Sequence, residues 1–139
     1  MVSFLSTWLL VAQVLATTSA PPTGKFVHDG GKFTMTYDID KEAKVKFSFE
    51  VPGKPAFTSW SYPLKEIIPP YIYDVDFTET MEGVHHWYMM IHQLYPEAKF
   101  EKGDLMELLF RTSDSLHVQF EGRDTEFRRR PSPPGSLRK

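Results

Sequence analysis

The feature that most constrains this fold is a regular alternation of apolar and polar residues between positions 100 and 130. Apolar residues occupy every second position in two segments, residues 106–110 and 116–120. Because the side chains of a β-strand point alternately to its two faces, each segment is predicted to be a strand with one buried face. Polar stretches at 113–115 and 121–124 are typical of the turns of an antiparallel meander with a third strand. Such a meander must cover its apolar face, so we predict an all-β fold, an antiparallel β-sandwich.

The same alternation recurs earlier in the chain. Residues 32–39 and 45–51 are predicted to form a hairpin, and residues 71–77 a further strand. Residues 84–94 are aromatic and apolar throughout. A helix is one alternative there, but the β-branched and aromatic content favours one or two strands.

Two segments lack this pattern. Residues 21–31 read as a spacer followed by a turn at Asp29-Gly30-Gly31. The segment 52–70 contains several prolines, which cannot donate to a sheet ladder. We therefore expect a long irregular loop there, with at most a short strand at 56–62.

Composition restricts the functional classes. The chain has 139 residues, 41% of them hydrophobic, which argues for one domain with a core. The net charge of -2 gives no indication of a nucleic-acid partner or of an anionic membrane. The absence of cysteine excludes disulfides, thiol catalysis and cysteine-based zinc sites, and the absence of asparagine excludes N-glycosylation.

The two ends differ from the rest of the chain. Residues 4–15 are apolar and uncharged, and small residues follow them, so residues 1–19 are predicted to be a secretory signal peptide. An N-terminal membrane anchor or a buried strand is the alternative. Residues 20–130 would form the domain, and 131–139 a disordered basic tail. The protein is accordingly expected to be secreted and extracellular, without stable membrane insertion.

A basic cluster adjoins this tail and is formed by Arg128, Arg129, Arg130, Arg138 and Lys139. It could dock on acidic glycans or on a membrane surface. A solubilising tail is the favoured interpretation, because only five charges are involved.

Other chemistry-bearing residues give no recognised pattern. His85, His86 and His92 do not match a zinc-ligand spacing, and adjacent residues of a strand point to opposite faces. Asp74 and Asp76 lack the glycine turn of a calcium loop. No nucleophile motif, phosphate-binding loop or dinucleotide fingerprint is present. We therefore predict no metal, no cofactor and no enzymatic activity.

Several segments, taken in order, resemble a galectin domain, a jelly-roll-like sandwich that binds β-galactosides. Phe100-Glu-Lys-Gly103 followed by 106–110 is similar to the step from the family's Phe-x-x-Gly turn into its next strand. Residues 116–128 are similar to the following strand, its turn and its end. Upstream, 31–35 and 42–49 resemble the first long strand and the entry into the next. The resemblance covers residues 26–130 and implies a galectin-like fold.

The galectin sugar strand reads His-Phe-Asn-x-Arg, and the matching stretch is residues 76–80. Asp76 stands at the position of the His, Thr78 at that of the Asn and Thr80 at that of the Arg. The family's Trp-Gly-x-Glu is matched at Trp87 only by the tryptophan. The resemblance therefore implies altered glycan specificity, with these candidate ligand-binding residues: Asp76, Thr78, Thr80, His86 and Trp87.

On this interpretation the chain is a secreted, galectin-like carbohydrate-binding module whose partners are glycans or cell-surface glycoproteins. Trp87 would stack on a sugar ring, and Asp76 and the threonines would bond its hydroxyls. The alternative is a secreted β-sandwich that has lost sugar binding and acts as a protein-interaction module. A third possibility is an unrelated small β-barrel that carries an apolar ligand in an interior cavity.

Overall fold

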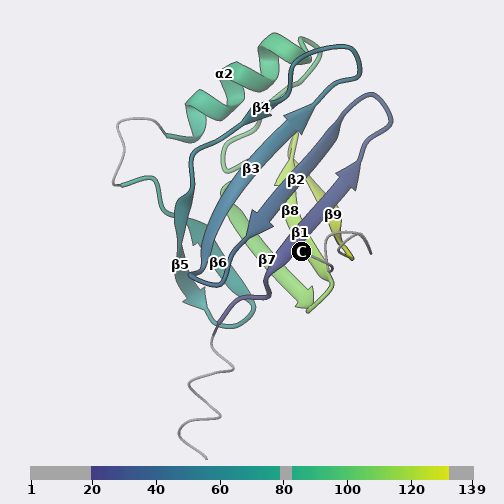
Figure 1. The fold of residues 1–139 in the computed structure, drawn as a ribbon. Coiled ribbons are helices and arrows are strands. Elements are labelled where there is room, and N and C mark those ends of the chain that lie inside the picture. Colours follow the sequence, from purple (N-terminus) through teal and green to yellow (C-terminus); the bar gives the residue numbers. More distant parts are fainter. Residues whose placement is uncertain (1–19, 79–82, 132–139) are drawn as a thin grey trace, which may run out of the picture.

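The computed structural model describes residues 20–78 and 83–131, in which antiparallel strands surround one core and a helix lies across one end (Figure 1). The strands are β1 (Gly24–Asp29), β2 (Thr34–Ile39), β3 (Lys44–Glu50), β4 (Phe57–Thr58), β5 (Tyr62–Ile68), β6 (Ile72–Val75), β7 (Glu107–Thr112), β8 (Ser115–Phe120) and β9 (Arg123–Arg130). The helix α2 (Val84–Leu94) connects β6 to β7. The predicted signal peptide, Thr80 and positions 132–139 of the predicted tail lie outside the described residues.

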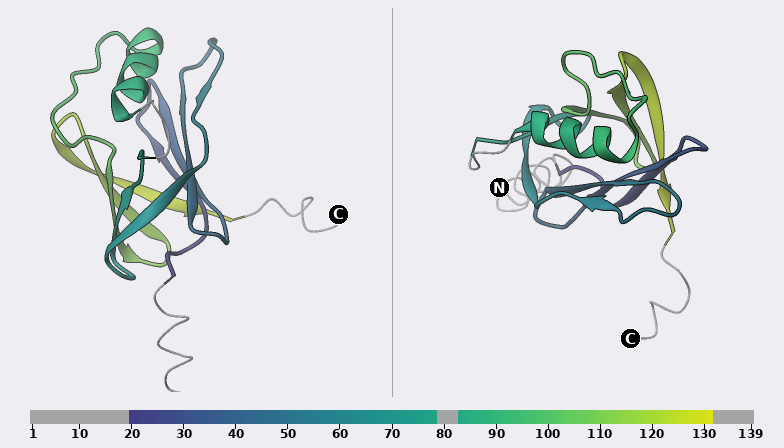
Figure 2. Two further views of the ribbon diagram at one scale, coloured as in Figure 1. Left: turned by 90° about the vertical axis from the view of Figure 1, so that its left-hand side faces the viewer. Right: turned by 90° about the horizontal axis from the view of Figure 1, so that it is seen from above.

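The sheet closes on itself because β1 pairs both with β2 and with the last strand, β9. The order runs from β2 through β3, β5, β6, β7, β8 and β9 to β1, which pairs with β2 again. This ring is a closed eight-stranded barrel, seen from two further directions in Figure 2. The short β4 adds to β3 outside the ring. The all-β antiparallel class is confirmed, but the sandwich is not, since the pairing continues round the ring without separating into two sheets.

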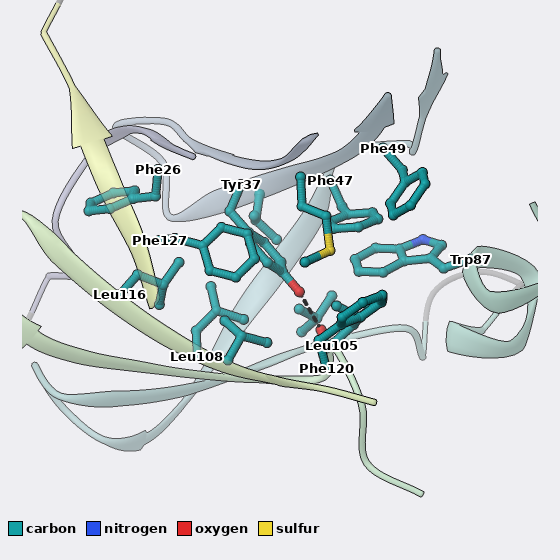
Figure 3. Packing of buried hydrophobic residues seen from close by; sticks show 14 of the residues in the cluster. Phe26, Tyr37, Phe47, Phe49, Trp87, Leu105, Leu108, Leu116, Phe120 and Phe127 are labelled. Carbon is teal, nitrogen blue, oxygen red and sulfur yellow. Dashed lines mark hydrogen bonds between the residues drawn. The ribbon is translucent and has the colours of Figure 1, made fainter. Parts of the chain in front are cut away.

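Inward-facing side chains fill the barrel (Figure 3). Alternate residues of β2 and β3 are buried as the sequence predicts, and so are those of β8. Tyr37 lies at the centre, with its ring centroid 5.1 Å from those of both Phe47 and Phe127. An eight-stranded barrel is just wide enough for its side chains to fill. The aromatic excess therefore forms the core, and it gives no support to the interior cavity that an apolar-ligand carrier would need.

The helix α2 corrects the strand prediction for residues 84–94. Its buried residues Val84, Trp87 and Ile91 are three and four positions apart, the spacing of one helical face. These apolar side chains are buried against the barrel. We call the end of the barrel that α2 covers the helical end. Lys54 Nζ donates to the carbonyl oxygen of Leu94 at 3.1 Å, which satisfies one of the free acceptors at the helix C-terminus.

Two further expectations are corrected. Residues 24–29, read as spacer and turn, form β1, with Phe26 fully buried. The segment 52–70 contains β4 and the seven-residue β5 rather than one long loop. Pro63 is tolerated in β5 because it precedes Leu64, the first residue paired with β6, and its carbonyl accepts a bond from Asp76 N–H.

The C-terminal meander is confirmed. β7, β8 and β9 are joined by tight turns where the polar stretches predicted them. Glu121 and Gly122 turn β8 into β9 with φ of 54° and 75°, the left-handed geometry of a two-residue hairpin. The hairpin of β2 and β3 and the strand β6 are confirmed as well.

Candidate functional site

A hollow lies on the outer wall of the barrel, across β6, β7, β8 and the start of β9. It encloses about 500 Å³, within the range of small-ligand sites. We call it the outer groove. Its lining residues are Asp74, Gly103, Met106, Glu107, Leu109, His117, Gln119 and Asp124.

Strand register brings two carboxylates together in this groove. Asp74 of β6 lies directly opposite Glu107 of β7, and like charges in such a pair repel. Neither side chain has a hydrogen bond or ion pair to any residue within 20–78 or 83–131. Lys65, opposite Asp74 on β5, is the nearest cross-strand cation. The groove therefore offers unengaged acceptors to a ligand.

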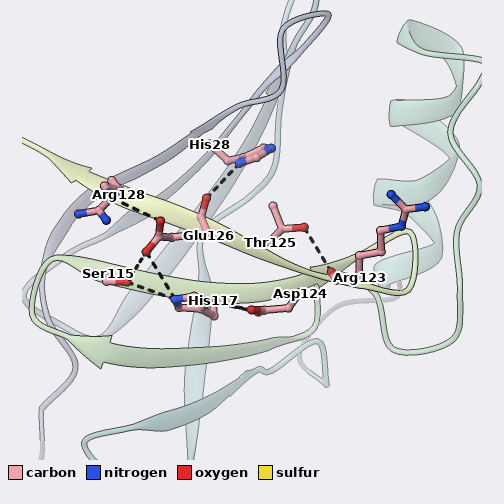
Figure 4. Close-up of polar contacts among 8 residues, drawn as sticks. All are labelled: His28, Ser115, His117, Arg123, Asp124, Thr125, Glu126 and Arg128. Carbon is pink, nitrogen blue, oxygen red and sulfur yellow. Dashed lines mark hydrogen bonds and ion pairs between the residues drawn. The ribbon is translucent and has the colours of Figure 1, made fainter.

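His117 is held between acidic groups on the neighbouring strand (Figure 4). Its Nδ1 lies 3.0 and 3.1 Å from the two carboxylate oxygens of Asp124. Its Nε2 lies 3.3 Å from Ser115 Oγ and 3.6 Å from a Glu126 oxygen. Because both ring nitrogens have polar partners on β8 and β9, the ring is held in place in the groove wall.

Ser115, His117 and Asp124 have the residue types of a nucleophilic triad, but the hydrogen bonds run in the wrong direction. Ser115 Oγ donates its one hydrogen to Glu126 at 3.1 Å. The hydroxyl oxygen can then only accept from His117 Nε2, whereas a general base must take the hydroxyl proton. Ser115 is also only 8% exposed. The arrangement fixes β8 against β9.

A buried carboxylate holds the loop at one rim of the groove. Asp104 is fully buried and accepts four hydrogen bonds, which join the loop before β7 to the β8–β9 hairpin. The donors are the N–H groups of Glu101, Glu121 and Gly122 at 2.8, 2.9 and 3.1 Å, and Gln119 Nε2 at 2.7 Å. Four donors satisfy the lone-pair sites of a carboxylate, which offsets the cost of burying this polar group.

Two tyrosines bind the same loop. Tyr88 Oη donates to the carbonyl of Asp104 at 2.5 Å, and Tyr37 Oη donates to that of Leu105 at 2.8 Å. Burial, followed by the nearby charge of Asp104, raises the pKa of Tyr88 to about 12. Burial, with smaller effects from Tyr88 and Asp104, also raises the pKa of Tyr37. Both phenols are therefore neutral donors at physiological pH and anchor Met106 and Gly103 at the groove rim.

The sequence-predicted residues do not form one exposed site. Trp87 is fully buried, with its ring stacked on Phe47, so it offers no sugar-stacking surface. Thr78 donates through its hydroxyl and its N–H to Asp76 at 2.6 and 2.9 Å, and these bonds lower the pKa of that carboxyl. His86 packs edge-on against Phe57. The correction for Trp87 follows from its place on the inner face of α2.

The sequence does not single out the groove residues, because they occupy outward-facing strand positions. Polar residues are expected there on any solvent-exposed face. From the sequence, Asp74 stands out only as a possible cation ligand. The register that sets Asp74 opposite Glu107 depends on a pairing of strands separated by α2, and local alternation does not reveal it. A usable signal is the clustering of Glu107, His117, Gln119 and Asp124 on one face of the predicted meander.

Within residues 20–78 and 83–131, no group of three or more histidine, aspartate or glutamate side chains is arranged to hold a metal ion. No helix among the described residues has both the length and the apolar character needed to span a membrane. No family model, no curated protein and no solved structure matches the chain.

Proposed function

We propose that this chain is a secreted carbohydrate-binding module, acting without catalysis, whose ligand lies in the outer groove. The observation that carries the proposal is the groove itself: unengaged carboxylates, an imidazole and an amide surround an apolar floor. The groove carries the proposal because a barrel fold by itself hosts many activities.

The polar groups suit a ligand rich in hydroxyls. Asp74 and Glu107 each present carboxylate oxygens that accept hydrogen bonds from O–H donors. Hydrogen bonds to a charged acceptor are about twice as strong as neutral ones, which favours neighbouring hydroxyls on one sugar ring. Gln119 donates its Nε2 hydrogens to Asp104 and to the carbonyl of Lys102, so its side-chain oxygen remains for a ligand donor.

The apolar floor suits the C–H face of a sugar. Met106 and Leu109 lie between the polar groups and are both partly exposed. An aliphatic floor replaces the aromatic platform that the sequence predicted at Trp87. The galectin resemblance supports the class of ligand, while the binding residues differ from the stretch at 76–80.

The test is a glycan array probed with the protein secreted from cells that express the full chain. Any hit is then titrated with the parent and with the isosteric double variant Asp74→Asn/Glu107→Gln. We expect affinity to fall by at least about tenfold, because charge-assisted bonds become neutral ones. Glu50→Gln, an exposed carboxylate variant on β3 across the barrel, is the matched control and should bind as the parent does.

Two results would overturn the proposal. One is a silent array from a protein whose near-ultraviolet circular dichroism shows a packed core. The other is glycan binding that the double variant leaves unchanged.

A second function, a protein-interaction module, is favoured by a different residue. Trp60 lies between β4 and β5 with 70% of its surface exposed, and exposed tryptophan is enriched at binding hot spots. Loss of captured protein partners in Trp60→Ala, with glycan binding unchanged, would support this function.

A further inference from the structure

The end of the barrel opposite α2 has an exposed apolar tip. The turn from β5 to β6 carries Ile67, Ile68 and Tyr71, which are 44, 54 and 56% exposed. Pro69 and Pro70 lie between them, and Tyr71 N–H donates to the Ile68 carbonyl at 2.8 Å to close the turn. We call these five consecutive residues the aliphatic tip. They are contiguous, in contrast to the scattered apolar residues of an ordinary surface.

The tip projects beyond the neighbouring strand. Pairing between β3 and β5 stops at Lys44 opposite Pro63, and the last bond on that side joins Leu64 N–H to Ala43. The remainder of β5 pairs with β6 alone. The tip therefore stands out from the barrel, where it can meet a flat partner without a clash from the β2–β3 turn.

The up-and-down topology gathers positive charge at this same end, which we call the terminal end. It holds the β2–β3, β5–β6 and β7–β8 turns and the end of β9. Eight exposed cations stand there against five exposed carboxylates, a net charge of +3. The cations are Lys25, Lys41, Lys44, Lys65, Arg111, Arg128, Arg129 and Arg130, and the carboxylates are Asp40, Glu42, Glu66, Asp114 and Glu126.

Both ends of the described chain also leave from here. Ala20 and Pro22 share a shallow hollow with Pro70, Tyr71 and Arg111. β9 ends at Arg130, and the sequence continues towards two further cations, Arg138 and Lys139. The terminal end thus combines a projecting apolar tip with basic residues of the barrel.

We propose that the terminal end docks on the surface of an anionic lipid bilayer. The aliphatic tip enters the boundary between headgroups and acyl chains, and the surrounding lysines and arginines meet anionic headgroups. Peripheral binding needs two such signals acting together, and neither alone is strong. A polyanion such as a sulfated glycan would engage the cations but leave the tip in water, so the tip favours lipid. This inference is independent of the groove and its ligand.

The test is co-sedimentation of the secreted protein with vesicles. Phosphatidylcholine vesicles are compared with vesicles that contain one third phosphatidylserine, at low and high salt. We expect binding to the anionic vesicles only, and weaker binding at high salt. The variant Ile67→Ser/Ile68→Ser should bind at least about tenfold less well.

The matched control is Met89→Ser, since Met89 is 53% exposed on α2 at the helical end. It should bind vesicles as the parent does. All variants share residues 1–19. The comparison between them is therefore the same whether or not these residues are removed. Equal binding by the tip variant and the parent would overturn the proposal. So would binding to heparin without binding to vesicles, or no binding by the parent.

Discussion

The indole of Trp87 lies face to face with the ring of Phe47, with centroids 4.8 Å apart and planes 12° from parallel. Tyr62 and Phe77 meet the same indole edge-on, at 5.8 and 5.1 Å. One side chain of α2 therefore closes the helical end of the barrel through three rings from different segments. Trp87 is the largest of the three side chains that α2 buries.

Replacement of Trp87 by alanine is expected to lower the free energy of unfolding by about 3–5 kcal/mol, because it leaves a large cavity in the core. Trp60→Ala removes the same side chain from an exposed position and should change stability by less than about 0.5 kcal/mol. Urea unfolding followed by circular dichroism measures both. Equal losses in the two variants would contradict the structure.

Replacement of Asp104 by asparagine should cost about 2–4 kcal/mol of stability. The four donors around this carboxylate would face an amide whose NH₂ group cannot accept, so at least one N–H would be buried without a partner. Asp124→Asn, an exposed carboxylate on the same hairpin, should cost less than about 1 kcal/mol. Chemical denaturation at neutral pH compares them. A tolerated Asp104→Asn would mean that the loop is held by other contacts.

Ser115 is expected to be inert towards a fluorophosphonate probe, because its hydroxyl hydrogen is directed at Glu126 and not at His117. Intact-mass spectrometry after incubation should show unmodified protein. A denatured sample treated in the same way is the control for non-specific labelling. Stoichiometric labelling that is lost in Ser115→Ala would instead reveal a nucleophile and contradict the expected lack of enzymatic activity.

Tyr88→Phe should alter stability in alkaline solution. The folded-state pKa of about 12 lies above the ordinary value of 10.0. The neutral phenol therefore contributes stability that is fully present below pH 10 and is lost as the pH rises towards 12. The variant should lose about 1 kcal/mol at pH 8 with its hydrogen bond, and it should decline less steeply than the parent between pH 10 and 12. Parallel curves for the two proteins would disprove the assignment.

Alternation and turn signals predicted the strands whose two faces differ most and the pairing of neighbours across short turns, but not the long-range pairing that closes the sheet. Met35, Phe47 and Val118 are buried as the period of two requires. The same alternation is compatible with a sandwich and with a barrel, because in both folds every strand buries one of its two faces. The pairing of Val27 with Arg128 makes this sheet a barrel, and it joins opposite ends of the described chain.

The helix and the groove show two different limits of sequence interpretation. In residues 84–94 the residue types favoured strand, while the spacing of Val84, Trp87 and Ile91 already carried the helical period. The outer groove was hidden for a different reason. Its carboxylates meet only through the register of β6 with β7, which α2 and the long loop after it separate in sequence.

Closure of the ring by β1 and β9 has a consequence for the order of folding. Every other pairing around the barrel joins consecutive long strands, whereas this seam joins residues about 100 positions apart through three paired positions. Loop-closure entropy delays such a contact. We expect the seam to form last and to open first, so that β1 amides exchange with solvent before those of β2. Until it forms, two strand edges remain available to other chains, and slow closure would favour aggregation over a stable monomer.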